Sequence, residues 1–149
     1  MSASPSSESI IPRPPDRVLF LCVHNSSRSQ MAEGFARAMA PESTLVMSAG
    51  SEPRGVHAEA IAAMAEVGVD IRSQTSKSLA EVPWQQADLV VTLCNEGAEV
   101  CPQLATGVRR VHWLLPDPGA EPPERQPEAF REMRDEIRWR VASLWPRGD

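Results

Sequence analysis

Residues 18–35 read VLFLCVHNSSRSQMAEGF, and this stretch decides the fold class. Its first four residues form a continuous apolar run, which is typical of a strand buried on both faces. From about Arg28 the apolar residues recur every three or four positions, as on one face of an amphipathic helix that Pro41 ends. The stretch therefore predicts a buried strand, a tight polar loop and a helix, in that order.

The rest of the chain repeats this alternation. Short apolar runs predict three more strands, at residues 44–49, 88–93 and 108–113. Helical spacing of apolar residues predicts a helix around residues 61–65 and a long final helix over residues 130–144. Strands that alternate with helices imply an α/β fold with three layers, α/β/α, built on a four-stranded parallel sheet.

Length and composition favour one soluble domain. The chain has 149 residues, of which 42% are hydrophobic, so it can bury a core without disulfides. Residues 1–16 are rich in Ser and Pro and lack an apolar segment, so we expect a disordered tail followed by a single domain over residues 17–146. No run of 18 apolar residues occurs, so we expect no membrane span and a cytoplasmic location.

Charge and cysteine content narrow the function classes. The net charge of −5 argues against nucleic-acid binding, which usually requires a basic face. Three cysteines exclude a fully paired framework of the secreted type and suit a reducing compartment. Any anion site must therefore be local, and the cysteines must serve chemistry or simple burial.

The loop between the first predicted strand and helix fits the pattern C-x5-R-S. A loop that curls into a helix N-terminus directs backbone N–H groups at one point, where the helix dipole favours a tetrahedral oxyanion. Arg28 can close this site with a bidentate contact, and the same field stabilises the thiolate of Cys22 as a nucleophile. Asn25 tolerates left-handed backbone, and Ser29 can donate to the thiolate. We expect oxyanion binding and loop support from Val23, His24, Asn25, Ser26, Ser27, Arg28 and Ser29.

Two further cysteines, Cys94 and Cys101, follow the third predicted strand. In an intact helix their spacing would separate the Cα atoms by about 10.5 Å, beyond the ~7 Å limit for a disulfide. The thiols can pair only if such a helix unwinds, which Gly97 in the middle and Pro102 at the end would favour. The pair is a candidate redox switch coupled to local unwinding.

The loop segment resembles the phosphate loop of the low-molecular-weight protein tyrosine phosphatase fold, and in particular the start of thioredoxin-coupled arsenate reductases on that fold. The resemblance extends over roughly residues 17–145, and Cys22, Cys94 and Cys101 match the family's three functional cysteines. It implies that Cys22 attacks arsenate and that Cys94 then attacks Cys22 and releases arsenite. Cys101 would next attack the Cys22–Cys94 disulfide, which leaves a Cys94–Cys101 disulfide. Thioredoxin would reduce the final disulfide as electron donor, and no tightly bound cofactor is implied.

Asp117-Pro118 follows the fourth predicted strand and resembles the family's general-acid loop, in which an Asp protonates the departing oxygen. Phosphatases of this fold usually place aromatic residues after that Asp, whereas this chain has no Tyr and continues with Gly119. The resemblance therefore implies a small inorganic substrate: arsenate, with phosphate or sulfate as competing oxyanions.

Some arsenate reductases of this fold bind potassium beside the phosphate loop. The matching positions here are Asn25, Glu33, Ser48 and Thr75. Lys77 stands where that site would need a carboxylate. We expect its ammonium group to replace the cation, and therefore no bound metal.

The sequence leaves two other functions open. A low-molecular-weight phosphatase would use Cys22, Arg28 and Asp117 and leave the later cysteine pair idle. A zinc- or arsenite-binding module would use the three thiols, with His112 as a further ligand.

Otherwise all three histidines are expected to be structural or solvent-facing. A glutaredoxin or a small thiol could replace thioredoxin, and a monomer is expected.

Overall fold

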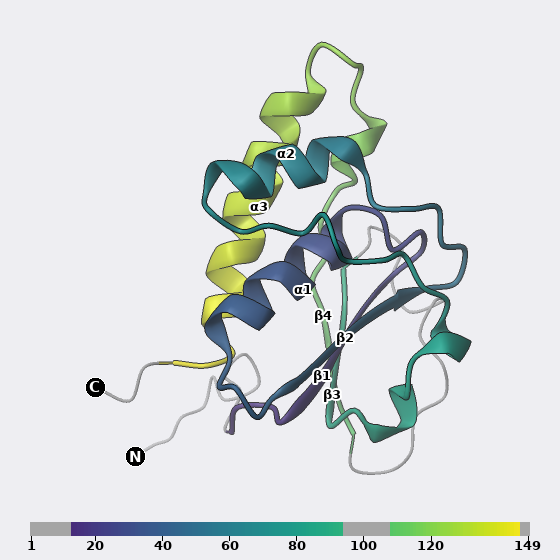
Figure 1. Cartoon of the computed structure of the whole chain (residues 1–149), viewed down its shortest axis with the longest axis vertical. Helices are drawn as coiled ribbons and strands as arrows, with labels where there is room; N and C mark the ends of the chain where they lie inside the picture. Colours follow the sequence, from purple (N-terminus) through teal and green to yellow (C-terminus); the bar gives the residue numbers. More distant parts are fainter. Residues whose placement is uncertain (1–12, 94–107, 147–149) are drawn as a thin grey trace.

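The computed structural model describes residues 13–93 and 108–146, which carry colour in Figure 1. Four strands form one sheet: β1 (Arg17–Cys22), β2 (Leu45–Gly50), β3 (Leu89–Thr92) and β4 (Arg109–His112). Their order is β2-β1-β3-β4, and every neighbouring pair is parallel. The predicted α/β fold with a four-stranded parallel sheet is confirmed.

The parallel register brings the carboxyl ends of the strands to one edge. Cys22 at the end of β1 is aligned with Gly50 at the end of β2, and Leu21 is aligned with Thr92 of β3. Ligands of open parallel sheets bind outside this edge. The register therefore places the loops that follow β1 and β2 around one location.

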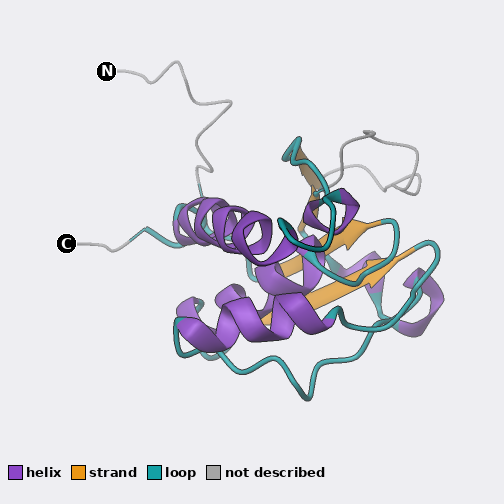
Figure 2. Ribbon diagram, turned by 90° about the horizontal axis from the view of Figure 1, so that it is seen from above, coloured by secondary structure: helices purple, strands orange, loops and turns teal. Residues whose placement is uncertain are grey.

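Three α-helices cover one face of the sheet: α1 (Arg28–Met39), α2 (Ala58–Glu66) and α3 (Gln126–Ala142). The arrangement of α3 beside α1 and α2 can be followed in Figure 1 and Figure 2. Their apolar faces meet side chains of β1 in the larger core cluster, where Phe20 and Phe35 are fully buried. Burying each such side chain contributes about 1.5–3 kcal/mol. This core fixes α1, and the loop before it, against β1.

The helix ends follow local chemistry. α1 ends two residues before Pro41, and Gly68 follows α2 with a φ of 82°, a left-handed conformation that glycine adopts without strain. α3 begins at Gln126, before the apolar stripe that starts at Phe130, because Pro127 fits the first turn of a helix. No described helix has the length and apolar character that crossing a membrane would require.

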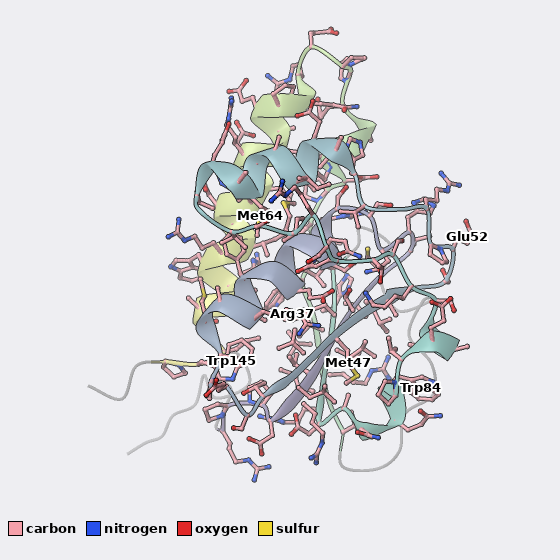
Figure 3. All side chains as sticks on the ribbon, viewed as in Figure 1. Arg37, Met47, Glu52, Met64, Trp84 and Trp145 are labelled. Carbon is pink, nitrogen blue, oxygen red and sulfur yellow. The ribbon has the colours of Figure 1, made fainter. Side chains whose placement is uncertain are left out.

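The second face of the sheet carries a smaller core cluster that includes Leu19 and Met47. Two 3-10 turns, η2 (Leu79–Glu81) and η3 (Trp84–Gln86), lie over it. Figure 3 labels Met47, which belongs to this cluster, and Trp84, which packs against the cluster. In the described part of the chain this third layer is thus built from 3-10 turns, whereas the α-helices lie on the first face.

Residues 13–16 contact the domain, although the sequence analysis assigned them to the tail. The indole N–H of Trp145 donates to the carbonyl of Pro15 at 3.2 Å, and the guanidinium of Arg109 donates to the carbonyl of Arg13 at 2.8 Å. The backbone N–H of Asp16 donates to the carboxylate of Asp88 at 3.1 Å. These bonds hold the chain where it enters β1.

Candidate active site

A cavity of about 360 Å³ lies where β1 ends. Cys22, the last residue of β1, lines it together with Arg28 at the start of α1. The opposite walls come from residues 54–57 and from Asp117 with Gly119. The structure thus brings together three predicted site residues. Cys22 and Arg28 belong to the same loop, and Asp117 comes from a segment far away in the sequence.

The sulfur of Cys22 is buried and lies 3.0 Å from the hydroxyl oxygen of Ser29. Asn25 has a φ of 50°, so the loop adopts the left-handed turn that its sequence predicts. Ser27, the N-cap residue of α1, makes no side-chain capping bond within the described structure. The first backbone N–H groups of α1 therefore remain available to an anion in front of Cys22.

The carbonyl groups of the loop accept hydrogen bonds from the backbone of residues 52–57. The carbonyls of Val23, His24 and Ser26 accept backbone N–H groups of Glu52, Arg54 and His57 at 2.8, 3.1 and 3.0 Å. Figure 3 labels Glu52, the first of these three donor residues. Because these carbonyls are already hydrogen-bonded, the N–H groups of the loop remain available to an anion. This is the electrostatic arrangement that an oxyanion requires.

Arg28 is the buried cation of the site, with 6% of its surface exposed. One terminal nitrogen donates to the carbonyl of Leu115 at 2.8 Å, and the other lies 3.9 Å from a carboxylate oxygen of Asp117. Its Nε–H is buried and has no hydrogen-bond partner among the described residues. A buried donor without an acceptor is unfavourable by about 1–3 kcal/mol. An oxyanion bound next to Cys22 would supply the acceptor.

Asp117 caps the short turn η5 (Pro118–Ala120), where its Oδ1 accepts the backbone N–H of Gly119 at 2.9 Å. The other oxygen, Oδ2, is the one that lies near Arg28. The Asp117 side chain is 37% exposed, so it borders both the cavity and the solvent. One oxygen fixes the carboxyl group while the second can carry a proton for a departing oxygen.

Behind the loop lies a polar network that sequence reasoning missed. Gln30 is fully buried, and its amide donates to the backbone carbonyl and the side-chain oxygen of Asn25, each at 3.0 Å. The hydroxyl of Ser76 donates to the carbonyl of Asn25 at 2.9 Å, and the backbone N–H of Lys77 donates to Asn25 Oδ1 at 2.8 Å. These partners lie up to 52 positions from Asn25 in the sequence. No short motif could have pointed to them.

Gly50 is a second residue that the sequence reasoning missed. A Cβ at this position would lie 2.6 Å from the carbonyl oxygen of Val23, 2.7 Å from that of Cys22 and 2.9 Å from the backbone nitrogen of Asn25. All three are backbone atoms and cannot rotate away. Only glycine therefore lets the end of β2 approach the Cys22 loop this closely.

The positions matched to a potassium site lie together beside this network. The Glu33 carboxylate is 3% exposed and accepts the Ser48 hydroxyl at 2.6 Å. Arg37, labelled in Figure 3, contacts its second oxygen at 2.8 Å. The ammonium group of Lys77 lies 3.6 Å from Glu33 and donates to the carbonyl of Thr75. A cationic group thus already lies among the oxygens that would coordinate potassium.

The three histidines, expected to be structural or solvent-facing, lie in different surroundings. His24 and His57 both line the cavity, and His24 lies 3.7 Å from Glu52. His57 also caps α2, since its Nδ1 accepts the backbone N–H of Glu59. His112 hydrogen-bonds to the Thr92 hydroxyl across the neighbouring strands β4 and β3. His24 and His57 lie at the cavity because residues 52–57 return to the loop of β1, which local spacing does not reveal.

Cys94 and Cys101 lie outside the described residues. The last described residue before them, Leu93, donates its backbone N–H to the carbonyl of Leu21 at 2.9 Å. Leu21 directly precedes Cys22 in the sequence. The backbone that leads into Cys94 is therefore paired with the backbone that leads into Cys22.

Comparison with known proteins agrees with this geometry. The family model for low molecular weight phosphotyrosine protein phosphatase matches residues 17–147. The chain belongs to this family, as the resemblance of its loop predicted.

The relatives on this fold include arsenate reductases. The arsenate reductase of Halalkalibacterium halodurans is 45% identical over 129 residues, which are 85% of this chain and 93% of that protein. A solved structure of an arsenate reductase in the phosphate binding state has a TM-score of 0.74 at 39% identity and covers 87% of this chain and 95% of its own. The thioredoxin-dependent arsenate reductase of Corynebacterium glutamicum has a TM-score of 0.71 at 32% identity, covering 91% of this chain and 62% of that one.

Proposed function

We propose that this chain is an arsenate reductase with Cys22 as its nucleophile. The observation that carries the proposal is the buried Nε–H of Arg28, which has no partner among the described residues and belongs to the wall of the cavity that holds Cys22. A tetrahedral oxyanion satisfies this donor and the N–H groups at the start of α1 together. Relatives at 45% identity are arsenate reductases, which favours arsenate as that oxyanion.

The first step transfers arsenic to the thiolate. Cys22 Sγ attacks arsenic, an S–As bond forms, and an As–O bond breaks. Asp117 gives its proton to the departing hydroxyl group of the hydrogen arsenate ion, which leaves as water. Arg28 and the loop N–H groups neutralise the charge on the remaining oxygens. Arsenic is still pentavalent at this stage.

The second step is the reduction. The Cys94 thiolate attacks the Cys22 sulfur, and the electron pair of the S–As bond passes to arsenic, which leaves as trivalent arsenite. The two cysteines supply two electrons in becoming a disulfide. The pairing of Leu93 with Leu21 supports this step, because neighbouring strands lie only about 4.8 Å apart.

The third step restores Cys22. Cys101 attacks the Cys94 sulfur, Cys22 leaves as a thiolate, and a Cys94–Cys101 disulfide remains. A thioredoxin-type dithiol protein then reduces this disulfide and becomes oxidised itself. The thioredoxin dependence of the Corynebacterium glutamicum relative supports this choice of donor. Because thiols supply both electrons, the cycle requires no bound redox cofactor.

The test is arsenate-dependent oxidation of NADPH in the presence of thioredoxin and thioredoxin reductase. Wild type is compared with Cys22→Ser, Cys94→Ser and Cys101→Ser. We expect turnover in wild type and loss of turnover in all three variants. Hydrolysis of p-nitrophenyl phosphate serves as the matched control. Of the three cysteines it needs Cys22 alone, so it should survive in Cys94→Ser and Cys101→Ser. A wild type that hydrolyses this ester well but does not consume NADPH would be a phosphatase instead.

A further inference from the structure

The imidazole of His57 is held in one orientation at the wall of the cavity. Its Nδ1 accepts the backbone N–H of Glu59 at 3.0 Å, and its ring packs on Phe130 with centroids 4.7 Å apart. The backbone N–H of His57 donates to the carbonyl of Ser26 in the Cys22 loop at 3.0 Å. Contacts with α2, α3 and the loop thus fix this side chain relative to Cys22.

The capping bond also assigns the proton of the ring. Nδ1 accepts a hydrogen bond only when it carries no hydrogen, so the neutral ring holds its proton on Nε2. Nε2 lies 3.8 Å from where a Cβ of Gly119 would be, on the wall that also carries Asp117. Within residues 13–93 and 108–146, the capping bond to Glu59 is the hydrogen bond that the ring makes. A fixed N–H donor therefore lies in the cavity wall without an acceptor among the residues that the structure describes.

We propose that His57 is a substrate-binding residue whose Nε2–H donates to the outward oxygen of the oxyanion held by the Cys22 loop. This inference rests on the proposed function, because that oxygen is the one that departs when Cys22 attacks. The loop N–H groups and Arg28 serve the oxygens nearest the sulfur. His57 and Asp117 belong to other segments and serve the opposite side of the tetrahedron.

This position makes His57 a determinant of specificity. Inorganic arsenate or phosphate presents an unesterified hydroxyl oxygen on the Asp117 side, which can accept a hydrogen bond without a substituent in the way. An aryl phosphate presents an ester oxygen there, which is a weaker acceptor and carries a bulky group. His57 therefore favours the unesterified oxyanion, and its removal should affect the two substrate classes unequally.

Two substitutions separate the donor from the helix cap. Asparagine is a strong N-cap residue, so His57→Asn keeps the bond to Glu59, but its amide ends near the position of Nδ1. Glutamine is one carbon longer, so His57→Gln places an amide N–H near the position of Nε2 and gives up the cap. The pair distinguishes loss of the donor from damage to α2.

The experiment measures the Kd of inorganic phosphate by titration calorimetry and kcat/KM for arsenate and p-nitrophenyl phosphate. We expect His57→Asn to weaken phosphate binding and to lower arsenate kcat/KM about tenfold, the effect of losing one hydrogen bond in a shielded site. Hydrolysis of the aryl ester should change by less than about twofold, and the melting temperature should stay at the wild-type value. His57→Gln should restore phosphate binding and melt at a lower temperature.

Unchanged phosphate affinity in His57→Asn would overturn the inference. Equal losses for arsenate and the aryl ester would also overturn it, since a distorted site loses both. Phosphate titration involves no turnover, so a wild type that binds phosphate but fails to reduce arsenate would refute the proposed function while the Kd comparison still tests His57.

Discussion

The hydroxyl oxygen of Ser29 lies 3.0 Å from the sulfur of Cys22, and the same hydroxyl is hydrogen-bonded to a third residue. The side-chain amide of Asn25 donates to the same hydroxyl at 2.8 Å. Because this bond uses a lone pair of the Ser29 oxygen, the hydroxyl proton can point to the sulfur. Ser29 can therefore donate a hydrogen bond to the thiolate form of Cys22.

Replacing Ser29 with alanine should make Cys22 less reactive. A hydrogen bond to a charged group contributes about 1.5–3 kcal/mol, and 1.4 kcal/mol corresponds to about tenfold. We expect Ser29→Ala to slow alkylation of Cys22 by iodoacetamide about tenfold at pH 7. The measurement is made in a Cys94→Ser, Cys101→Ser background, where Cys22 is the remaining cysteine. Ser78→Ala, at a half-buried serine bonded to Glu81, is the matched control, and equal rates in both variants would refute this role.

Asp117 should act as the proton donor of the first step. Asp117→Asn keeps an oxygen that can accept the N–H of Gly119 but cannot deliver a proton. We expect the rate of arsenate turnover to fall about 100-fold or more, in line with the loss of a general acid. Phosphate binding should persist, which calorimetry checks. Asp135→Asn, a change on the exposed side of α3, is the control, and a loss below about threefold in Asp117→Asn would contradict the assignment.

The close approach at Gly50 predicts that even a methyl group displaces the Cys22 loop. Gly50→Ala places Cβ against three backbone atoms, and such overpacking is destabilising by about 1–3 kcal/mol. We expect a lower free energy of unfolding in urea and a loss of phosphate binding in the folded variant. Ser51→Ala, at the exposed neighbouring residue, should change neither. Full phosphate affinity in Gly50→Ala would mean that the loop tolerates the shift.

The parts of the site that follow strands could be predicted from the sequence. Cys22 and Asp117 each come shortly after an apolar run, and parallel topology brings such positions to one edge. The strand bounds were also close, since β2 was expected at residues 44–49 and spans Leu45–Gly50. Local patterns determine where the strands lie in the sequence, and the topology rules for parallel sheets determine that their carboxyl ends share one edge.

The supporting residues could not be predicted, because their roles depend on contacts between distant segments. Gln30 bonds to Gln74 and to the carbonyl of Thr75, more than 40 positions away. His57 enters the cavity because residues 52–57 bond to the loop that follows β1. Neither residue has a motif of its own. Their functions become visible only when the backbone of both segments is known.

The ion pairs of Glu66 predict a specific acid sensitivity. Hydrogen bonds from Arg131, and then from Arg134, lower the pKa of Glu66 from 4.5 to about 2. A carboxyl group with a depressed pKa stabilises the fold at pH values above its unfolded pKa, and this contribution is lost as the pH falls from about 4.5 to about 2. These contacts join the end of α2 to α3.

Glu66→Gln should therefore melt below wild type at pH 7, and the difference in melting temperature should shrink as the pH is lowered through this range. Calorimetry or circular dichroism across a pH series provides the measurement. Glu42→Gln removes an exposed carboxylate for which the described residues provide no ion pair, so its difference from wild type should stay small at every pH. A difference for Glu66→Gln that is constant with pH would show that the ion pairs do not control it.

The ammonium group of Lys77 predicts how the enzyme responds to potassium. It lies 3.6 Å from the buried carboxylate of Glu33 and donates to the carbonyl of Thr75, two groups that would otherwise suit a monovalent cation. We expect wild-type turnover to be equal in potassium and sodium at the same ionic strength. Lys77→Ala removes the ammonium group and leaves Glu33 with Arg37 and Ser48.

Potassium should then raise the melting temperature and the turnover of Lys77→Ala above their values in sodium, because a cation of suitable size can take the place of the ammonium group. Lys77→Met fills the same space with an apolar chain and should respond to neither salt, so it serves as the matched control. Stimulation of the wild type by potassium but not by sodium would show that a cation binds beside Lys77 after all. An identical response of Lys77→Ala to both salts would show that the space it opens does not select potassium, and the Glu33 carboxylate would then rely on Arg37 for its charge partner.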